Sequence, residues 1–504
     1  MNAGTSYQWL LDHHRETAVY DSIRQLLGWD RRTYLPRAGS RHRAAQTATL
    51  AGILYKRRTD PQTGDMLDRV EQSDMVRDPL SDIAVNIREW RRSYDRARRV
   101  PESLAVELAR ASSESESAWE TARPQNDWQG FLPHLDRLVK LKREEAAALA
   151  AGGELYDALI EQFEPGESAA GIQPIFQKLA GALADLLDRI RGSGRKPEPG
   201  ILRCDAPPDR QKDLILHIAS HIGYDLQGGR IDQSAHPFTS GMGPGDVRIT
   251  TRYDETCILP ALFSSIHETG HAIYYQGLPA VHWGTPRGSA VSMAVHESQS
   301  LMWENMVGRS TGFWKCFLPA VRERFPRLDA VSFRDFHFAV NEVRPGLIRV
   351  DADEVTYNLH IILRFELEKT LVGGELEPDG LPQAWNEKMR RYLGLTPPDF
   401  ATGVMQDVHW SMGSIGYFPS YALGNVYAAQ FYAKAARDLE DPEWFFESGD
   451  FEPFADWFRA NVYAHGSRYL PRELVKEATG EELNPQYLIE YLNRKFGALY
   501  GTNG

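Results

Sequence analysis

The chain of 504 residues contains only three cysteines, Cys204, Cys257 and Cys316. An odd number at wide spacing excludes a disulfide framework and a cysteine zinc ribbon, and it favours a reducing cytoplasm. No apolar run is long enough to span a bilayer, and the N-terminus lacks the basic and apolar regions of a signal peptide. Positive charge is scarce: 57 lysines and arginines stand against 69 acidic residues, a net charge of −12. We therefore expect neither a membrane nor nucleic acid as a partner.

Basic residues gather in one place, the segment from Arg88 to Arg99. Apolar residues in and before this segment are spaced by four, three and four positions: Ile83, Ile87, Trp90 and Tyr94. This spacing places them on one face of a helix. We interpret the arginines as the solvated face of that helix rather than as a binding patch.

Apolar residues recur at helical spacing through most of the chain, so the sequence predicts a mainly α-helical fold. Helices are expected over residues 7–28, 41–57, 82–99 and 130–151. Residues 229–251 differ, because Val247, Ile249 and Thr251 alternate with polar residues. This alternation predicts a strand in a small hairpin or three-stranded sheet.

The most informative stretch runs from His267 to His271 and reads H-E-T-G-H. Pro260 suits the first turn of a helix, and Gly277 suits the position just past its end. Histidines at i and i+4 lie on one face of a helix, where two imidazoles can bind one metal ion. Glu268 could then act as general base on a metal-bound water, as in zinc hydrolases. The alternative is an ordinary solvated or packed helix that contains two histidines by chance.

A zinc site with a catalytic water needs a third protein ligand. Glu297 is the candidate, because residues 289–308 are predicted to form a second helix with an apolar side, where a carboxylate needs a partner. An antiparallel return would bring Glu297 to His267 and His271. Zinc is the expected metal, and Co²⁺ or Mn²⁺ could occupy the same ligands. The predicted strand lies just before the metal helix, so an extended peptide could pair with its edge.

Five motifs occur in order along the chain. They are D-x-R-x-T at Asp246–Thr250, H-E-x-x-H at His267–His271, H-E-S-Q at His296–Gln299, I-R-x-x-A-D at Ile348–Asp353 and G-x-x-Q-D-x-H-W at Gly403–Trp410. Through these motifs the sequence resembles the carboxypeptidase Taq family of zinc metallocarboxypeptidases. No motif position departs from the family pattern, and the similarity extends to the N-terminal region around Trp29.

The resemblance implies a fold similar to neurolysin and angiotensin-converting enzymes, with a deep central groove and a small β-sheet beside the metal site. It implies a cytoplasmic enzyme, often a homodimer, that releases single amino acids from peptide C-termini with broad specificity. We expect residues 1–504 to form a single catalytic unit. Approximately residues 1–200 would form a helical groove wall, and residues 201–504 would form the metal-binding and catalytic half.

Amide hydrolysis places negative charge on the former carbonyl oxygen, and this charge needs a hydrogen-bond donor. The segment from Gly416 to Tyr421 is expected to be a loop that folds over the substrate. We expect Tyr421 to be the oxyanion donor, with Tyr417 as second candidate and His409 nearby. The alternative is that the tyrosines belong to an aromatic core. Asp407 is expected to orient His409 or a metal-bound histidine.

An exopeptidase must also bind a free C-terminal carboxylate, which matches the planar fork of an arginine. Arg349 is the first choice; the helix after it is expected to begin with Asp351 as N-cap and Glu354 three residues on. Arg248 is the second choice, with an ion pair to a neighbouring acidic residue as the alternative. His236 is a further candidate, lining the groove beside the strand.

Two other functions remain open at this stage. The same metal chemistry would serve an oligopeptidase that cleaves internal bonds of short peptides. A non-catalytic helical peptide-binding protein could instead use the metal only for structure.

Overall fold

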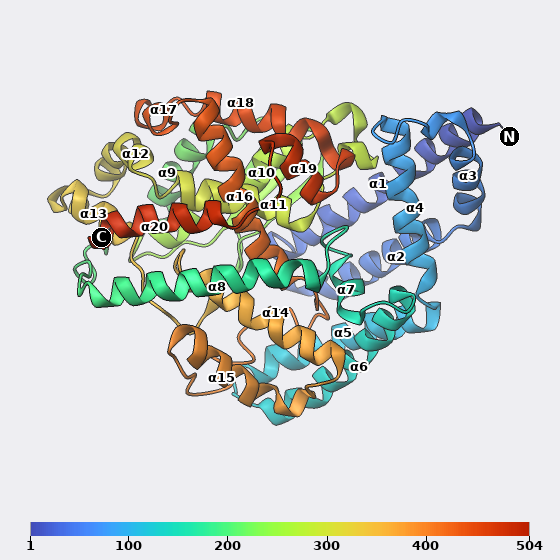
Figure 1. Ribbon diagram of the computed structural model, residues 1–504, viewed down its shortest axis with the longest axis horizontal. Helices are drawn as coiled ribbons and strands as arrows, with labels where there is room; N and C mark the ends of the chain where they lie inside the picture. The colour runs from blue at the N-terminus through green and yellow to red at the C-terminus, as the bar shows by residue number, and fades with distance from the viewer. Residues whose placement is uncertain (1, 503–504) are drawn as a thin grey trace.

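The computed structural model describes residues 2–502 and consists mainly of α-helices with one small sheet (Figure 1). The predicted mainly α-helical fold is confirmed. No helix within residues 2–502 is both long enough and apolar enough to cross a membrane. The two ends of the chain lie at opposite sides of the view in Figure 1.

The first four helices form a layer of their own at the N-terminal end of the molecule. They are α1 (Ala3–Thr33), α2 (Ser40–Arg58), α3 (Pro61–Glu71) and α4 (Asp82–Arg99). A small separate core holds α1, α3 and α4 together: Leu10, Met66, Leu67, Val70, Ile87, Trp90 and Tyr94. The predicted helices over 7–28, 41–57 and 82–99 are therefore confirmed, and the last has the predicted bounds.

Three arginines of α4 bond to neighbouring parts of the chain. Arg91 pairs with Glu71 on α3, and Arg88 donates to the backbone carbonyls of Ser467 and Arg468. Arg96 donates to the carbonyl of Ala158. These three arginines bind other parts of the chain, so they do not form a binding patch. The expected solvated face is found only in part, because Arg98 and Arg99 alone among the arginines of this segment are exposed.

The remaining helices share one large core that includes residues from Ala122 to Tyr500 and crosses position 200. In the N-terminal part they are α5 (Glu102–Ala122), α6 (Trp128–Ala150), α7 (Leu155–Ile160), α8 (Ala169–Gly192) and α9 (Pro208–His221). In the middle they are α10 (Leu259–Gly277), α11 (Met293–Leu301), α12 (Thr311–Arg324), α13 (Phe333–Val340), α14 (Tyr357–Gly373) and α15 (Leu381–Leu393). The last are α16 (Phe418–Asp438), α17 (Glu443–Ser448), α18 (Glu452–Asn461), α19 (Pro471–Thr479) and α20 (Gln486–Tyr500). The long helix α8 packs against α14 and α20 across the middle of Figure 1.

The sheet has three strands, β1 (Gly229–Gln233), β2 (Thr239–Gly243) and β3 (Asp246–Thr251), in the order β1-β3-β2. Strand β3 is central and buries Val247 and Ile249, as the alternation predicted; it pairs parallel with β1 and antiparallel with β2. The edge strand β2 packs against α1 and α10. The small sheet is thus confirmed, and it lies beside the predicted metal helix.

A cavity of about 640 Å³ lies between the N-terminal helices and this sheet. Helices α1 and α4 line one side with His14 and Trp90. Gly241 of β2, Tyr275 of α10 and Trp283 line the other side. The edge strand therefore borders an open space within the molecule.

Helix α11 begins later than predicted. Residues 289–292 precede the helix, and the Ser292 hydroxyl caps it by accepting from the backbone N–H of Val295. After Leu301 the chain continues as one π-helical segment, Met302–Val307. The predicted start near Ser289 is wrong because the N-cap lies at Ser292.

The predicted N-cap at Asp351 is also wrong. Residues Arg349–Asp351 form a single 3₁₀ turn, and α14 begins at Tyr357. The Asp353 carboxylate accepts from the backbone N–H groups of Val355 and Thr356, so it terminates the turn and starts the helix. Glu354 pairs with Lys495 instead of completing a capping box.

Candidate metal centre and active site

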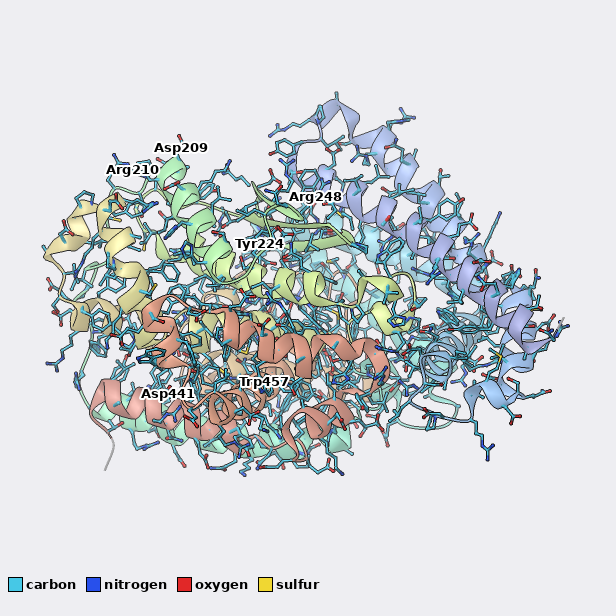
Figure 2. All side chains as sticks on the ribbon, turned by 90° about the horizontal axis from the view of Figure 1, so that it is seen from above. Asp209, Arg210, Tyr224, Arg248, Asp441 and Trp457 are labelled. Atoms are coloured by element: carbon cyan, nitrogen blue, oxygen red, sulfur yellow. The ribbon has the colours of Figure 1, made fainter. Side chains whose placement is uncertain are left out.

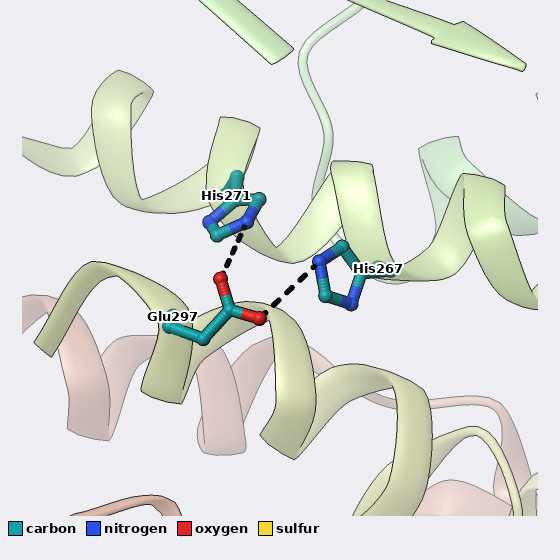
Figure 3. Close-up of side chains that lie close together, drawn as sticks. All are labelled: His267, His271 and Glu297. Atoms are coloured by element: carbon teal, nitrogen blue, oxygen red, sulfur yellow. Dashed lines mark ion pairs between the residues drawn. The ribbon is translucent and has the colours of Figure 1, made fainter. Parts of the chain in front are cut away.

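Three side chains from two neighbouring helices converge on one point (Figure 3). Helix α10 supplies His267 and His271, and α11 supplies Glu297. The two Glu297 oxygens face one imidazole each, at 3.7 Å from His267 Nε2 and 3.4 Å from His271 Nε2. The structure thus brings together the three ligands predicted from the sequence.

The outer nitrogen of each imidazole is already bonded. His267 Nδ1 donates to Glu304 Oε2 at 2.9 Å, and His271 Nδ1 donates to the backbone carbonyl of His296 at 3.1 Å. A carboxylate and a carbonyl only accept, so both Nδ1 atoms carry the proton. Each Nε2 therefore faces the centre, and a metal ion bound there would take the place of any proton on it, which is the arrangement of metal-binding histidines.

These spacings fit a metal ion. In a tetrahedral site with bonds of about 2.1 Å, ligand atoms lie about 3.4 Å apart, close to the two distances observed here. The centre is also strongly negative. Burial lowers the pKa of His267, but the carboxylates of Glu297, Glu304 and Glu268 outweigh it and raise that pKa to about 10. A divalent cation would neutralise this concentration of carboxylates.

Two glycines allow the helices that carry the ligands to approach closely. A Cβ on Gly270 of α10 would lie 2.7 Å from the backbone carbonyl oxygen of Gln299 on α11. A Cβ on Gly424 of α16 would lie 3.0 Å from Glu297 Cβ, since α16 packs on the other side of α11. The position of Glu297 therefore depends on the absence of side chains at both sites.

Glu268 is buried next to the ligands, on the same helix. Its Oε2 accepts a hydrogen bond of 2.6 Å from the hydroxyl of Thr239, the first residue of β2. The edge strand and the predicted general base are thus directly linked. Because Thr239 holds Oε2, the hydrogen-bond capacity of Oε1 remains for another partner.

The predicted oxyanion donors form one cluster, in which Tyr421 lies on a helix and His409 lies in the turns before it. Tyr417 is the N-cap of α16 and Tyr421 lies in the first turns of that helix, where Pro419 suits the helix start. The expectation of a loop that folds over the substrate is therefore wrong for Tyr421, which lies in a helix. His409 Nε2 lies 3.1 Å from Tyr421 Oη, and the Tyr417 ring meets the Tyr421 ring edge-on at 5.1 Å.

Burial sets the protonation of this cluster. It raises the pKa of the Tyr421 phenol, and the charge of Glu297 raises it further, so the hydroxyl stays protonated. Burial and the nearby Arg349 guanidinium lower the pKa of His409 to about 3, so its imidazole is neutral. The cluster therefore presents neutral donors close to the carboxylate ligand.

Arg349 is buried, and one edge of its guanidinium is occupied. Its Nε and Nη2 donate to Asp407 Oδ1 at 2.9 and 2.8 Å, while Arg364 donates to Asp407 Oδ2. Its Nη1 lies 3.5 Å from the Tyr357 hydroxyl and is not held by Asp407. The expected role of Asp407 in orienting His409 is wrong, because two arginines take its oxygens.

Arg248 and His236 lie on and next to the sheet. Arg248 is labelled on the sheet in Figure 2. It forms a two-point ion pair with Asp246, and its guanidinium carbon lies 4.3 Å from the centre of the Trp29 ring of α1. The alternative reading of Arg248, an ion pair with an acidic neighbour, is what the structure contains. His236 is exposed in the connection between β1 and β2, three residues before Thr239.

Sequence reasoning missed three residues that support the site. Glu304 holds His267, and Arg364 and Glu368 on α14 hold the segment that carries His409. Glu304 was detectable, since it lies seven residues after Glu297 and thus on the same helix face. Arg364 and Glu368 gave only a weak signal, because they are charged residues at i and i+4 in a helix that also carries Glu366 and Lys369.

Known proteins resemble the whole chain. Residues 9–496 match the family described as carboxypeptidase Taq (M32) metallopeptidase. Thermostable carboxypeptidase 1 of Thermus thermophilus is 54% identical, over 99% of this chain and 100% of that protein. Carboxypeptidase 1 of Bacillus subtilis is 39% identical, also over 99% of this chain and 100% of that protein. The crystal structure of an M32 carboxypeptidase from Deinococcus radiodurans R1 matches with a TM-score of 0.95 at 39% identity, covering 99% of this chain and 100% of that one.

The family predicted from the five motifs is therefore confirmed, and with it a hydrolase that acts on peptide bonds and uses a divalent metal. The buried cluster of two histidines and one glutamate gives that metal a place in this chain. The chain belongs to the carboxypeptidase Taq (M32) family and is a metal-dependent carboxypeptidase.

Proposed function

We propose that His267, His271 and Glu297 hold a zinc ion and that Glu268 is the general base. The reaction proposed for this site is the release of single amino acids from peptide C-termini. The convergence of the three ligand side chains, with Glu268 buried on the same helix as the two histidines, is the observation that carries the proposal. When bound, zinc supplies Lewis acidity and lowers the pKa of a coordinated water. Cobalt or manganese suits the same nitrogen and oxygen donors, so metal analysis of the purified protein tests the assignment.

Glu268 moves the proton in this proposal. Thr239 holds Oε2, so Oε1 takes a proton from the attacking water. The same carboxyl later delivers a proton to the leaving amine. The Thr239 hydroxyl also lies 3.0 Å from the backbone carbonyl of Glu268, so its one proton is shared between two acceptors of the same residue.

We propose Tyr421 as the donor to the developing oxyanion. His409 bonds to its hydroxyl, and in the Nε2–H tautomer His409 donates, which leaves the Tyr421 proton free for the substrate oxygen. Tyr417 is the second candidate, because its ring lies against Tyr421. A neutral phenol that stays protonated suits stabilisation of negative charge.

Peptide binding is proposed to use the edge strand and the arginines. The free edge of β2 runs from Thr239, which is bonded to Glu268, toward Gly241 in the wall of the cavity. An extended peptide that pairs with this edge would pass the general base. Arg349 Nη1 is the first candidate to bind the C-terminal carboxylate; Arg248 and His236 remain weaker candidates, because one is ion-paired and the other is exposed.

Further properties are proposed on the family resemblance. We propose that residues 1–504 act as one catalytic unit, in which approximately residues 1–200 form a groove wall and residues 201–504 the catalytic half. The shared core across position 200 supports the single unit. We also propose a homodimer in the cytoplasm, with peptides rather than nucleic acid or membranes as partners. Sedimentation of the purified protein tests the dimer.

Release of free amino acids from blocked dipeptides, with and without chelator, tests the proposed reaction. Release that stops with chelator and resumes with zinc is expected. Equal cleavage of C-terminally amidated and free-acid peptides would favour an oligopeptidase. An intact metal site without any hydrolysis would favour a peptide-binding protein.

A further inference from the structure

We propose that Glu368 is a positioning residue for the reaction, because its buried carboxylate holds both ends of the segment from His409 to Tyr417. This inference rests on the proposed role of His409 and Tyr421. Glu368 lies on α14 and does not contact the metal ligands, so it would act only through the segment.

The two oxygens of Glu368 receive three hydrogen bonds. Oε1 accepts from Trp410 Nε1 at 2.8 Å, and Oε2 accepts from the backbone N–H of Gly416 at 2.9 Å. Trp410 directly follows His409, and Gly416 directly precedes Tyr417. One carboxylate therefore fixes the residues next to both aromatic groups of the site. The third donor, the Tyr156 hydroxyl at 2.7 Å, comes from α7, outside the segment.

The segment has little regular structure to hold it in place. Residues 409–416 form turns between two helices, without a strand or helix of their own. Gly416 has φ of +93°, and a Cβ there would lie 2.8 Å from the backbone carbon of Leu159, so the chain passes tightly under α7. Fixed side-chain acceptors replace the missing ladder of backbone bonds.

Burial makes this carboxylate dependent on its donors. Glu368 is fully buried, and burial raises its pKa to about 7 while the bonds from Tyr156, Gly416 and Trp410 oppose that rise. A glutamine would keep one accepting oxygen and would point an N–H₂ group at a donor. The loss of one acceptor would therefore release at least one end of the segment.

The same helix holds the preceding part of the motif. Arg364, one turn before Glu368, is also fully buried and donates to Gln406 and Asp407. Side chains at i and i+4 lie on one helix face. One face of α14 thus supports residues 406–416, and Glu368 supports the part that carries His409.

The test is a double-mutant cycle between Glu368→Gln and Tyr421→Phe, with kcat and KM measured on a free-acid peptide. In the parent, E368Q is expected to lower kcat roughly 10- to 100-fold, with KM changed by less than about threefold. In the Y421F background the same change is expected to lower kcat by less than about threefold. Glu368 holds the segment that carries His409, and His409 bonds to the Tyr421 hydroxyl, which Y421F has already removed. An equal fold-loss in both backgrounds, or no loss in the parent, overturns the inference.

Glu366→Gln is the matched control. Glu366 lies on the same helix and accepts from Tyr392 and Lys388 of α15, which lie outside the segment. We expect parental kcat for E366Q. A loss of kcat equal to that of E368Q would mean that any damage to α14 suffices, and it would overturn the positioning role.

A second pair of variants decides the question if E368Q does not fold or if Y421F keeps parental kcat. The latter result would refute the proposed oxyanion donor, not the role of Glu368. Trp410→Phe and Tyr156→Phe each remove one donor to Glu368, the first inside the segment and the second outside it. A kcat for W410F at least about tenfold below that of Y156F supports positioning. Equal kcat values for the two variants overturn it.

Discussion

The approach of α10 to α11 places the metal ligands, and Gly270→Ala tests it. The added Cβ would lie 2.7 Å from both Gln299 O and Ser300 Cα, and 3.0 Å from Gln299 C. All three atoms belong to the backbone of α11, so no side chain can rotate out of the way. The helices must separate, and Glu297 must move relative to His267 and His271.

The magnitude follows from two opposing effects. Overpacking a tight interior costs about 1–3 kcal/mol, and contact with rigid backbone places this case at the upper end. Replacing a helical glycine by alanine raises the free energy of unfolding by about 1 kcal/mol through helix propensity. We expect a net loss of about 2 kcal/mol in the free energy of unfolding of the metal-free protein. Displacement of Glu297 should weaken zinc binding about 10- to 100-fold, as lost ligand positioning does.

Urea unfolding measures the first effect, and competition with a chromophoric chelator measures the second. Gly181→Ala is the matched control, because Gly181 lies inside α8 and nothing lies within 4 Å of its added Cβ. The free energy of unfolding of G181A should rise by up to about 1 kcal/mol, and this variant should bind zinc as the parent does. If G270A were stabilised like G181A and bound zinc normally, the close contact between α10 and α11 would be refuted.

Three further predictions concern chemistry and pH. Glu268→Gln should lower kcat by about 10²–10⁴ with full zinc content by elemental analysis, since it removes only a proton acceptor; loss of zinc would instead make Glu268 a ligand. Arg349→Ala should lower kcat/KM for free-acid peptides and leave amidated peptides equally poor, and a uniform loss on both would refute carboxylate binding. Burial raises the pKa of Glu164 from 4.5 to about 8, so the folded state keeps a proton that the unfolded state releases, and stability falls as pH rises between these values. Glu164→Gln should therefore become more stable relative to the parent by about 1 kcal/mol per pH unit from pH 5 to 8 in urea titrations, and a constant difference would contradict the burial argument.

The metal ligands could be predicted from the sequence because they depend on local geometry. His267 and His271 share a helix, and their spacing alone fixes their common face. The alternation in β3 likewise predicted the burial of Val247, Ile249 and Thr251, but not that of Thr250, which is buried as well. Glu297 needed one further step, since a buried carboxylate on an apolar helix requires a partner. These inferences use short-range periodicity, which tertiary packing did not override.

The predictions for Asp407 and for the segment around Tyr417 were wrong because contacts between residues far apart in the chain determine their structure. Asp407 was expected to orient a histidine, but it is held by Arg349 and by Arg364, which lies 43 residues away in the chain. The glycines near Tyr417 suggested a loop, whereas Pro419 starts a helix there. Periodicity does not show which buried charges will meet, so these pairings became visible only in the fold.

The most direct measurement is anomalous diffraction at the zinc absorption edge from crystals of the active protein. We expect one peak bounded by His267 Nε2, His271 Nε2 and the Glu297 carboxylate. An active protein with no peak among these three groups, or with its only peak elsewhere, would contradict it.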